Sequence, residues 1–183
     1  MHVLFQRSSG LIATLLIAGC TYIGTTKGTK APEAPTALSA VAVEYVTPRF
    51  NSQNIAGQAA LAEWAQISAV ARGVTPRVFA RAGVAAVLVD ENPNAPQDPA
   101  VAACRYMLVI TLSKATASVS QGYHNENAHL LLLDRRTHAT VWEGSTYMAG
   151  GASGFQAADL DKFLTGVIAA MHKDGIFDNT AAN

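Results

Sequence analysis

Cysteine is scarce in this sequence, which has only Cys20 and Cys104 in a chain of 183 residues. Two cysteines exclude the framework of several disulfides that stabilises many small secreted domains. Cys20 lies in an N-terminal segment that gives it another role, so Cys104 has no partner for a disulfide within the chain. We therefore expect the Cys104 thiol to be buried and unreactive, and a bridge between two chains is the alternative.

Charged residues are also few. They make up 14% of the chain, and 13 basic side chains balance 13 acidic ones. Because nucleic-acid binding needs clustered lysine and arginine, this composition argues against a nucleic-acid partner. The apolar fraction of 50% is typical of a folded globular protein rather than of a disordered chain.

Aromatic residues account for 7% of the chain, with two tryptophans. Each tryptophan fits either a core position or an exposed anchor in a protein interface, where tryptophan is enriched. The neighbours of Trp142 on one face of its predicted strand are small or polar, which makes an interface role more plausible there. The interface candidates are therefore Trp142 first, followed by Tyr123 and Tyr147.

The apolar segment near the N-terminus is too short to cross a bilayer. Residues 10–20 provide 11 positions, whereas a membrane-spanning helix needs about 20 apolar residues. The segment follows a basic residue, Arg7, and ends in the small residues Ala18 and Gly19 before Cys20. This order of basic, apolar and small residues is typical of a secretory signal peptide.

The run Leu16–Cys20 resembles the lipobox of bacterial lipoproteins. The resemblance implies that residues 1–19 are removed as a signal peptide, that Cys20 is lipidated, and that acyl chains such as palmitate hold the protein on the membrane. Thr21 follows the cysteine in place of aspartate, which implies the periplasmic face of the outer membrane. A transmembrane anchor and a chance cysteine in a cytoplasmic protein are the alternatives.

Residues 21–38 contain glycine, threonine, lysine, alanine and proline with no apolar period. This composition predicts a flexible tether, with a root-mean-square reach of about 23 Å for its 18 residues. A single domain of ordinary size, residues 39–178, is expected to follow. The last five residues, 179–183, are expected to form a disordered tail.

The periodicity of the apolar residues predicts three helices within the domain. An alanine-rich helix over 52–72, with Asn51 or Ser52 as its N-cap, is expected to end before Gly73, and a short helix is expected to begin at Pro76 and end at Gly83. The clearest helix is the C-terminal one, which Gly175 ends. Its apolar face comprises Leu160, Phe163, Leu164, Val167, Ile168 and Met171.

Alternation of apolar and polar residues, or continuous apolar runs, predicts the strands. They cover residues 39–46, 84–90, 106–120, 128–134 and 140–148, and a proline-rich loop covers 91–100. A hairpin connection, Arg135–His138, joins the last two strands. This order of elements predicts an α+β fold: a two-layer sandwich with a mixed or antiparallel sheet of four or five strands and helices on one face.

The pattern of elements resembles small periplasmic domains, namely the amino-terminal domain of the Tol-system protein TolB and export-accessory lipoproteins. The segments that carry the resemblance are the strand Leu130–Asp134, the turn Arg135–Thr137, the return strand Val141–Gly144 and the closing amphipathic helix. The resemblance implies a fold and a compartment. It implies no reaction, because no catalytic motif accompanies it.

Few residues suggest chemistry. His124, Glu126 and His129 are close in sequence, but their spacing differs from the H-E-x-x-H pattern that aligns two zinc ligands on a helix. Asp90 and Glu91 form an acidic pair at the end of a predicted strand. Solvated surface side chains explain both groups more simply than a site does, so we expect no metal site, no cofactor and no catalytic residue.

Two functional hypotheses follow. The first is a non-enzymatic outer-membrane lipoprotein that helps to assemble an envelope or export complex through protein–protein contacts, with self-association left open. The second is an envelope hydrolase or ligand-binding lipoprotein that uses either Asp90 and Glu91 or the group His124, Glu126 and His129. A pocket that unites several of these side chains would favour the second hypothesis, and their dispersal would argue against it.

Overall fold

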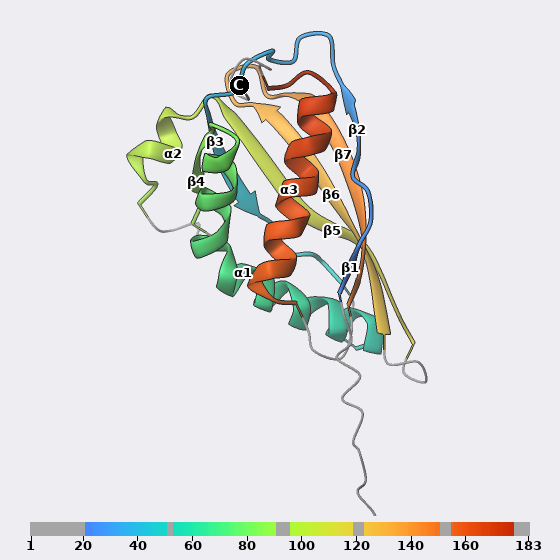
Figure 1. The fold of residues 1–183 in the computed structure, drawn as a ribbon. Helices are drawn as coiled ribbons and strands as arrows, with labels where there is room; N and C mark the ends of the chain where they lie inside the picture. Colours follow the sequence, from blue (N-terminus) through green and yellow to red (C-terminus); the bar gives the residue numbers. More distant parts are fainter. Residues whose placement is uncertain (1–20, 51–52, 91–95, 119–122, 151–154, 178–183) are drawn as a thin grey trace, which may run out of the picture.

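A computed structural model describes residues 21–50, 53–90, 96–118, 123–150 and 155–177. Within them the chain forms a curled sheet with two long helices packed against one face (Figure 1). The strands are β1 (Tyr22–Ile23), β2 (Lys27–Lys30), β3 (Ala40–Tyr45), β4 (Ala85–Leu88), β5 (Tyr106–Ser118), β6 (Tyr123–Asp134) and β7 (Ala139–Gly150). The helices are α1 (Ile55–Arg81), α2 (Pro99–Ala103) and α3 (Ala157–Lys173).

The sheet has seven strands among the described residues, more than the four or five expected, in the order β1-β7-β6-β5-β3-β4 with β2 also paired to β7. β5, β6 and β7 form the expected antiparallel meander, while β3 is parallel to both β4 and β5. The α+β class and the mixed sheet are therefore confirmed. The extra strands come from the segment that precedes residue 39.

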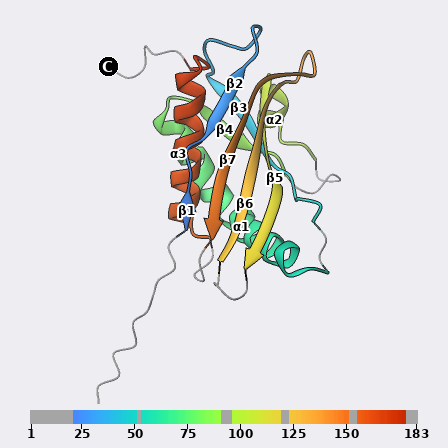
Figure 2. The ribbon, with the colours of Figure 1, turned by 90° about the vertical axis from the view of Figure 1, so that its right-hand side faces the viewer.

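That segment is not the flexible tether that its composition predicts. β1 and β2 pair antiparallel with β7 and so complete the sheet edge (Figure 2). A buried hydrogen bond between the hydroxyls of Thr26 and Thr146, 2.6 Å long, and a bond from the Gly24 amide to the Tyr147 carbonyl reinforce the pairing. The prediction was wrong because an edge strand needs backbone partners rather than an apolar period of its own. The folded domain therefore begins at about residue 21 rather than at 39.

Helix α1 is continuous where two helices were expected. Pro76 lies inside it, and the helix bends between its two halves (Figure 1). Proline removes the amide that would bond to the carbonyl of Arg72, a defect that bends a helix; the exposed position of Arg72 leaves that carbonyl close to water. Next to the proline, the buried Thr75 hydroxyl bonds to the Tyr45 hydroxyl at 2.8 Å and attaches this part of the helix to β3.

The N-cap of α1 is Asn54, whose side-chain oxygen accepts a hydrogen bond from the Gly57 amide at 2.7 Å. The expected caps, Asn51 and Ser52, lie outside the described residues. The side-chain cap satisfies one of the four amides that are left without partners at a helix start.

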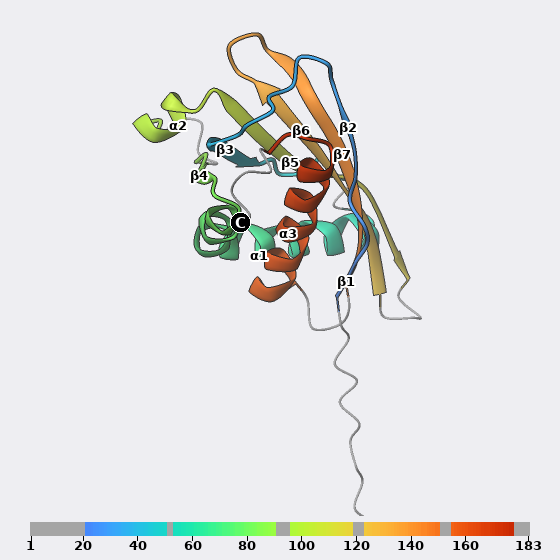
Figure 3. The ribbon, with the colours of Figure 1, turned by 45° about the horizontal axis from the view of Figure 1, so that its top comes forward.

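Helix α3 confirms the clearest prediction from the sequence. It buries Leu160, Phe163, Leu164, Val167 and Met171, and Ile168 is half-buried. Gly175 follows in the left-handed conformation, with φ of 71°. α3 crosses α1 on the same face of the sheet (Figure 3). Between these helices and the sheet lies the main core, which includes Val41, Val43, Tyr45, Leu108, Ile110, Leu112, Ala128, Leu130 and Leu132.

The short helix α2 replaces part of the expected loop 91–100 and lies away from α1 and α3 (Figure 3). Val101 and Cys104 pack with Ala42 in a second, small apolar cluster. Ala42 lies between Val41 and Val43 in β3, so its side chain points to the opposite face of the sheet. The expectation that all helices cover one face is therefore wrong for α2, although it covers only the part of the opposite face near β3 and β4.

No helix of the described residues has the length and the apolar character required to span a membrane.

Candidate functional site

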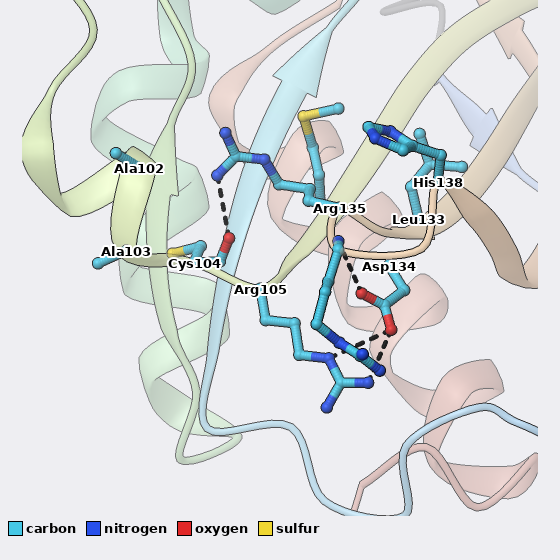
Figure 4. A pocket seen from close by; sticks show the side chains of 10 residues that line it. Ala102, Ala103, Cys104, Arg105, Leu133, Asp134, Arg135 and His138 are labelled. Atoms are coloured by element: carbon cyan, nitrogen blue, oxygen red, sulfur yellow. Dashed lines mark hydrogen bonds and ion pairs between the residues drawn. The ribbon is translucent and has the colours of Figure 1, made fainter.

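A pocket of about 720 Å³ lies at the end of the sheet where β5 begins and β6 turns into β7 (Figure 4). The end of α2, the start of β5 and the β6–β7 turn surround it. We call it the arginine pocket. Its lining residues are Ala102, Ala103, Cys104, Arg105, Met107, Leu133, Asp134, Arg135, Arg136 and His138.

An ion pair forms one wall of the arginine pocket. Arg105 donates two hydrogen bonds to Asp134 Oδ2, from Nε at 3.2 Å and from Nη2 at 2.7 Å. The hydrogen bond from Arg105 lowers the pKa of Asp134 to about 2, and the Arg136 amide adds a further bond at 2.9 Å. Asp134 is therefore a stable anion that neutralises Arg105 near pH 7.

Arg135 has a different kind of partner. Its Nη1 donates to the carbonyl oxygens of Val101 and Cys104, the second at 2.9 Å. These carbonyls lie in and just after the last turn of α2, where helix carbonyls lack partners. A carbonyl satisfies the donor without cancelling its charge, so Arg135 is held in place as a cation.

Arg136 and His138 are exposed on the turn. His138 adopts a left-handed backbone conformation, with φ of 59°, and its amide donates to the carbonyl of Asp134 at 2.8 Å. The turn therefore presents two side chains outward from a backbone that is fixed by its own hydrogen bonds.

Cys104 is one of the residues that line this pocket, and the prediction that it is buried is confirmed. Its Sγ donates to the carbonyl of Ala100 at 3.3 Å. Burial raises the pKa of the thiol. Because the thiolate is the reactive form, this environment makes Cys104 a poor nucleophile.

An apolar stripe runs from the arginine pocket across the sheet face opposite α1 and α3. It consists of Met107 and Val109 on β5 and their neighbours Leu133 and Leu131 on β6, all half-buried. We call it the open-face stripe. Glu143 on β7 is the register neighbour of Leu131, and Glu44 on β3 is that of Val109, so a glutamate flanks the stripe on each side. His129 Nε2 and Glu143 Oε1 form a 2.8 Å ion-pair contact on the same face.

The group His124, Glu126 and His129 does not converge. Glu126 is on the helix-covered side of β6 and is 2% exposed, whereas His129 points to the open face, three residues along a strand whose side chains alternate. The side chain of His124 lies outside the described part of the structure. No cluster of three metal-binding side chains occurs among the described residues.

The acidic pair is not united with that group either. Asp90 is exposed and lies 3.6 Å from Arg72 in a surface ion pair. Glu91 falls outside the described residues, as does the lipidation candidate Cys20. The described candidates of the second hypothesis thus occupy separate parts of the molecule.

Trp142 is not the exposed anchor that its neighbours suggested. It is 1% exposed, and its Nε1 donates to Asp174 Oδ2 at 2.7 Å, just after α3. The indole lies over two glycines: a Cβ built on Gly28 or on Gly144 would approach it within 2.5 Å. The small neighbours that suggested a wet face instead make room for the ring. Trp142 therefore belongs to the core.

Tyr147 is 42% exposed and lies beside Tyr22, with ring centroids 6.3 Å apart. It stays available as a surface candidate. The side chain of Tyr123 lies outside the described side chains.

Sequence reasoning missed a buried acidic pair, Glu63 on α1 and Glu126 on β6, each 2% exposed. Burial, followed by the charge of Asp159, raises the pKa of Glu63 to about 7. Burial, followed by the charge of Glu63, raises the pKa of Glu126 to about 8. Neither carboxyl oxygen of Glu126 has a hydrogen-bond partner among the described residues. The burial of Glu126 could have been predicted from the strand period, because Glu126 alternates in phase with the buried residues Ala128 and Leu130.

No protein-family model matches the chain, and no curated protein matches it. Among solved structures, the chain is similar at a low level to several, including the following three. The PelC dodecamer from Paraburkholderia phytofirmans is 15% identical, with 86% of this chain and 99% of that chain covered and a TM-score of 0.45. The lipoprotein GNA1162 from Neisseria meningitidis is 15% identical, with 74% and 99% covered and a TM-score of 0.31. Protein XCC0632 from Xanthomonas campestris is 13% identical, with 80% and 87% covered and a TM-score of 0.36.

Proposed function

We propose that this chain is a lipid-anchored accessory protein of the bacterial outer membrane that acts through protein–protein contacts and not by catalysis. The observation that carries the proposal is the sheet face opposite α1 and α3. It presents the open-face stripe next to a pocket with fixed charges, and such a combination of apolar and charged surface is typical of protein interfaces. Glu126, His129 and Asp90 lie in separate parts of the molecule, which also supports action by contacts over catalysis.

The lipobox-like run Leu16–Cys20 supports the anchor. Since β1 begins at Tyr22, two residues after Cys20, the link between the lipid and the sheet would reach no more than about 7 Å. The domain would then sit directly on the membrane, with the β1 end of the sheet nearest to it. The 23 Å tether estimated from the sequence is replaced by a close attachment that fixes which end of the sheet points away from the membrane.

Replacing Cys20 with serine should abolish lipid attachment, because a hydroxyl does not replace the thiol as the acyl acceptor in this pathway. The variant should be found in the soluble periplasmic fraction, and the wild type with the outer membrane. Metabolic labelling with a radioactive fatty acid and gradient fractionation measure both. Wild-type protein that takes up no label would contradict the anchor, and a Thr21→Asp variant tests the sorting assignment separately.

Complementation of a deletion strain tests action by contact. Asp90→Ala, His124→Ala, His129→Ala and Glu126→Gln should each retain nearly normal function, because none of these side chains is assigned a chemical step. Tyr147→Ser and Leu131→Thr should impair function at normal protein abundance, since interface energy is concentrated in a few apolar or aromatic residues. Complete loss of function in His124→Ala or His129→Ala, at normal abundance, would contradict the proposal in favour of a chemical site.

A further inference from the structure

The arginine pocket has more positive than negative side chains among its lining residues. Asp134 forms an ion pair with Arg105, and the charge of Arg136 also helps to lower the pKa of Asp134, but one carboxylate balances only one of the three arginine charges. The hydrogen bonds of Arg135 go to neutral carbonyls. Arg136 is exposed, and the group that it donates to Asp134 is its backbone amide. Since Asp134 is the only acidic side chain among the lining residues, two positive charges are left over, and His138 adds a third when it is protonated.

The apolar part of the same surface begins inside the pocket. Met107 and Leu133 belong to the pocket lining and also begin the open-face stripe, and they face each other in the β5–β6 register. Val109 and Leu131 follow at the next position of the same face. A ligand that fills the pocket and extends along the sheet would therefore meet charge first and apolar side chains next.

The position of the pocket excludes lipid headgroups as its ligand if the lipid anchor is correct. β1, which follows Cys20, pairs with the far end of β7 at Ala149, whereas the pocket adjoins the start of β7 near His138. Ten residues of strand separate Ala149 from the first residue of β7, which corresponds to roughly 33 Å. Figure 1 shows β1 at one end of the sheet and the β6–β7 turn at the other. The pocket thus points away from the anchored end.

We propose that the arginine pocket and the open-face stripe bind an acidic segment of a partner protein. Carboxylates of the segment would pair with Arg135 and Arg136, and its apolar side chains would cover Val109 and Leu131. Arginine is well suited to this role because its planar guanidinium pairs with a carboxylate through two parallel hydrogen bonds. The inference rests on the proposed function, in that it identifies the chemistry of the partner. An acidic polysaccharide would supply the charges but few apolar groups to cover the stripe.

The test uses two dye-labelled peptides of seven residues and the purified full chain in detergent micelles. One peptide alternates glutamate with leucine, and the other has glutamine in place of glutamate. Fluorescence polarisation should show that the acidic peptide binds more tightly than the neutral one, and that added salt weakens its binding. Arg136→Gln should weaken binding about fivefold, the effect of one partly exposed ion pair.

Two further variants complete the test. Arg49→Gln removes an exposed arginine that is not part of the pocket, and should leave binding of the acidic peptide unchanged. Leu131→Thr, which keeps a strand-forming residue but removes apolar surface, should weaken binding although the charges are intact. Thermal melts of each variant ensure that a misfolded protein is not taken for one with a weakened site.

Equal binding of the two peptides, or wild-type affinity in Arg136→Gln, would overturn the inference. Tighter binding of polyglucuronate than of the acidic peptide would overturn it in favour of a carbohydrate. If Arg136→Gln instead breaks up a self-associated form in sedimentation experiments, the occupant is a second copy of this chain and the inference is also wrong. These measurements need neither the lipid nor the cellular partner, so their failure is distinguishable from failure of the Cys20 and complementation experiments.

Discussion

Replacing Phe163 with alanine is expected to lower the free energy of unfolding by about 3–5 kcal/mol, a large share of the stability of one domain. Phe163 is 2% exposed on α3 and lies in the main core between the helices and the sheet. It also lines a void of about 10 Å³ together with Trp64 and Met148. Loss of the ring would enlarge this void, and a cavity adds to the cost of the lost apolar burial.

Urea unfolding of the chain from residue 21 onward measures the effect. This boundary keeps β1 and β2, which the boundary at residue 39 expected from the sequence would delete. Lys162→Ala, on the exposed side of the same helix, is the matched control and should change stability by no more than about 0.5 kcal/mol. A Phe163→Ala midpoint equal to that of the wild type would mean that α3 does not pack on the sheet as described.

Stability should fall as the pH rises from about 4.5 to about 8, because of Glu126. Its ordinary pKa of 4.5 is raised to about 8 in the folded protein, so over this range the folded chain holds a proton that the unfolded chain has released. The contribution of the neutral carboxyl is complete below pH 4.5 and is lost as the pH approaches 8. A shift of this size corresponds to about 3–5 kcal/mol. Glu63, with its pKa raised to about 7, acts in the same direction.

Glu126→Gln removes the ionisable group but keeps the shape of the side chain. The variant should be more stable than the wild type at pH 8, and its stability should depend less on pH between 5 and 8. Chemical unfolding at a series of pH values measures both effects. Parallel pH profiles for the two proteins would show that Glu126 does not stay buried and protonated in the native state.

Asp134 should produce the opposite dependence at low pH. Its pKa is lowered from 3.8 to about 2 in the folded state, so its contribution is present above pH 3.8 and is lost as the pH falls towards 2. Together, Glu126 and Asp134 predict that the protein is most stable in mildly acidic solution.

Local patterns in the sequence were sufficient for part of the fold. The apolar face of α3, its closing Gly175, and the strands β3, β4 and β5 all follow from the spacing of apolar residues within one segment. Such spacing carries the information because a helix or strand buries one side at its own period, whatever it packs against. The antiparallel meander follows as well, since short connections join its strands.

The tertiary structure decided which segments meet. β1 and β2 became strands only because β7, more than 100 residues later, offers a free edge. Trp142 is buried because Gly28 comes from a distant strand to lie under its ring. The arginine pocket likewise combines α2, β5 and the β6–β7 turn. None of these contacts leaves a local period, because backbone pairing and the packing of small residues under large ones depend on the partner segment and not on the spacing within either one.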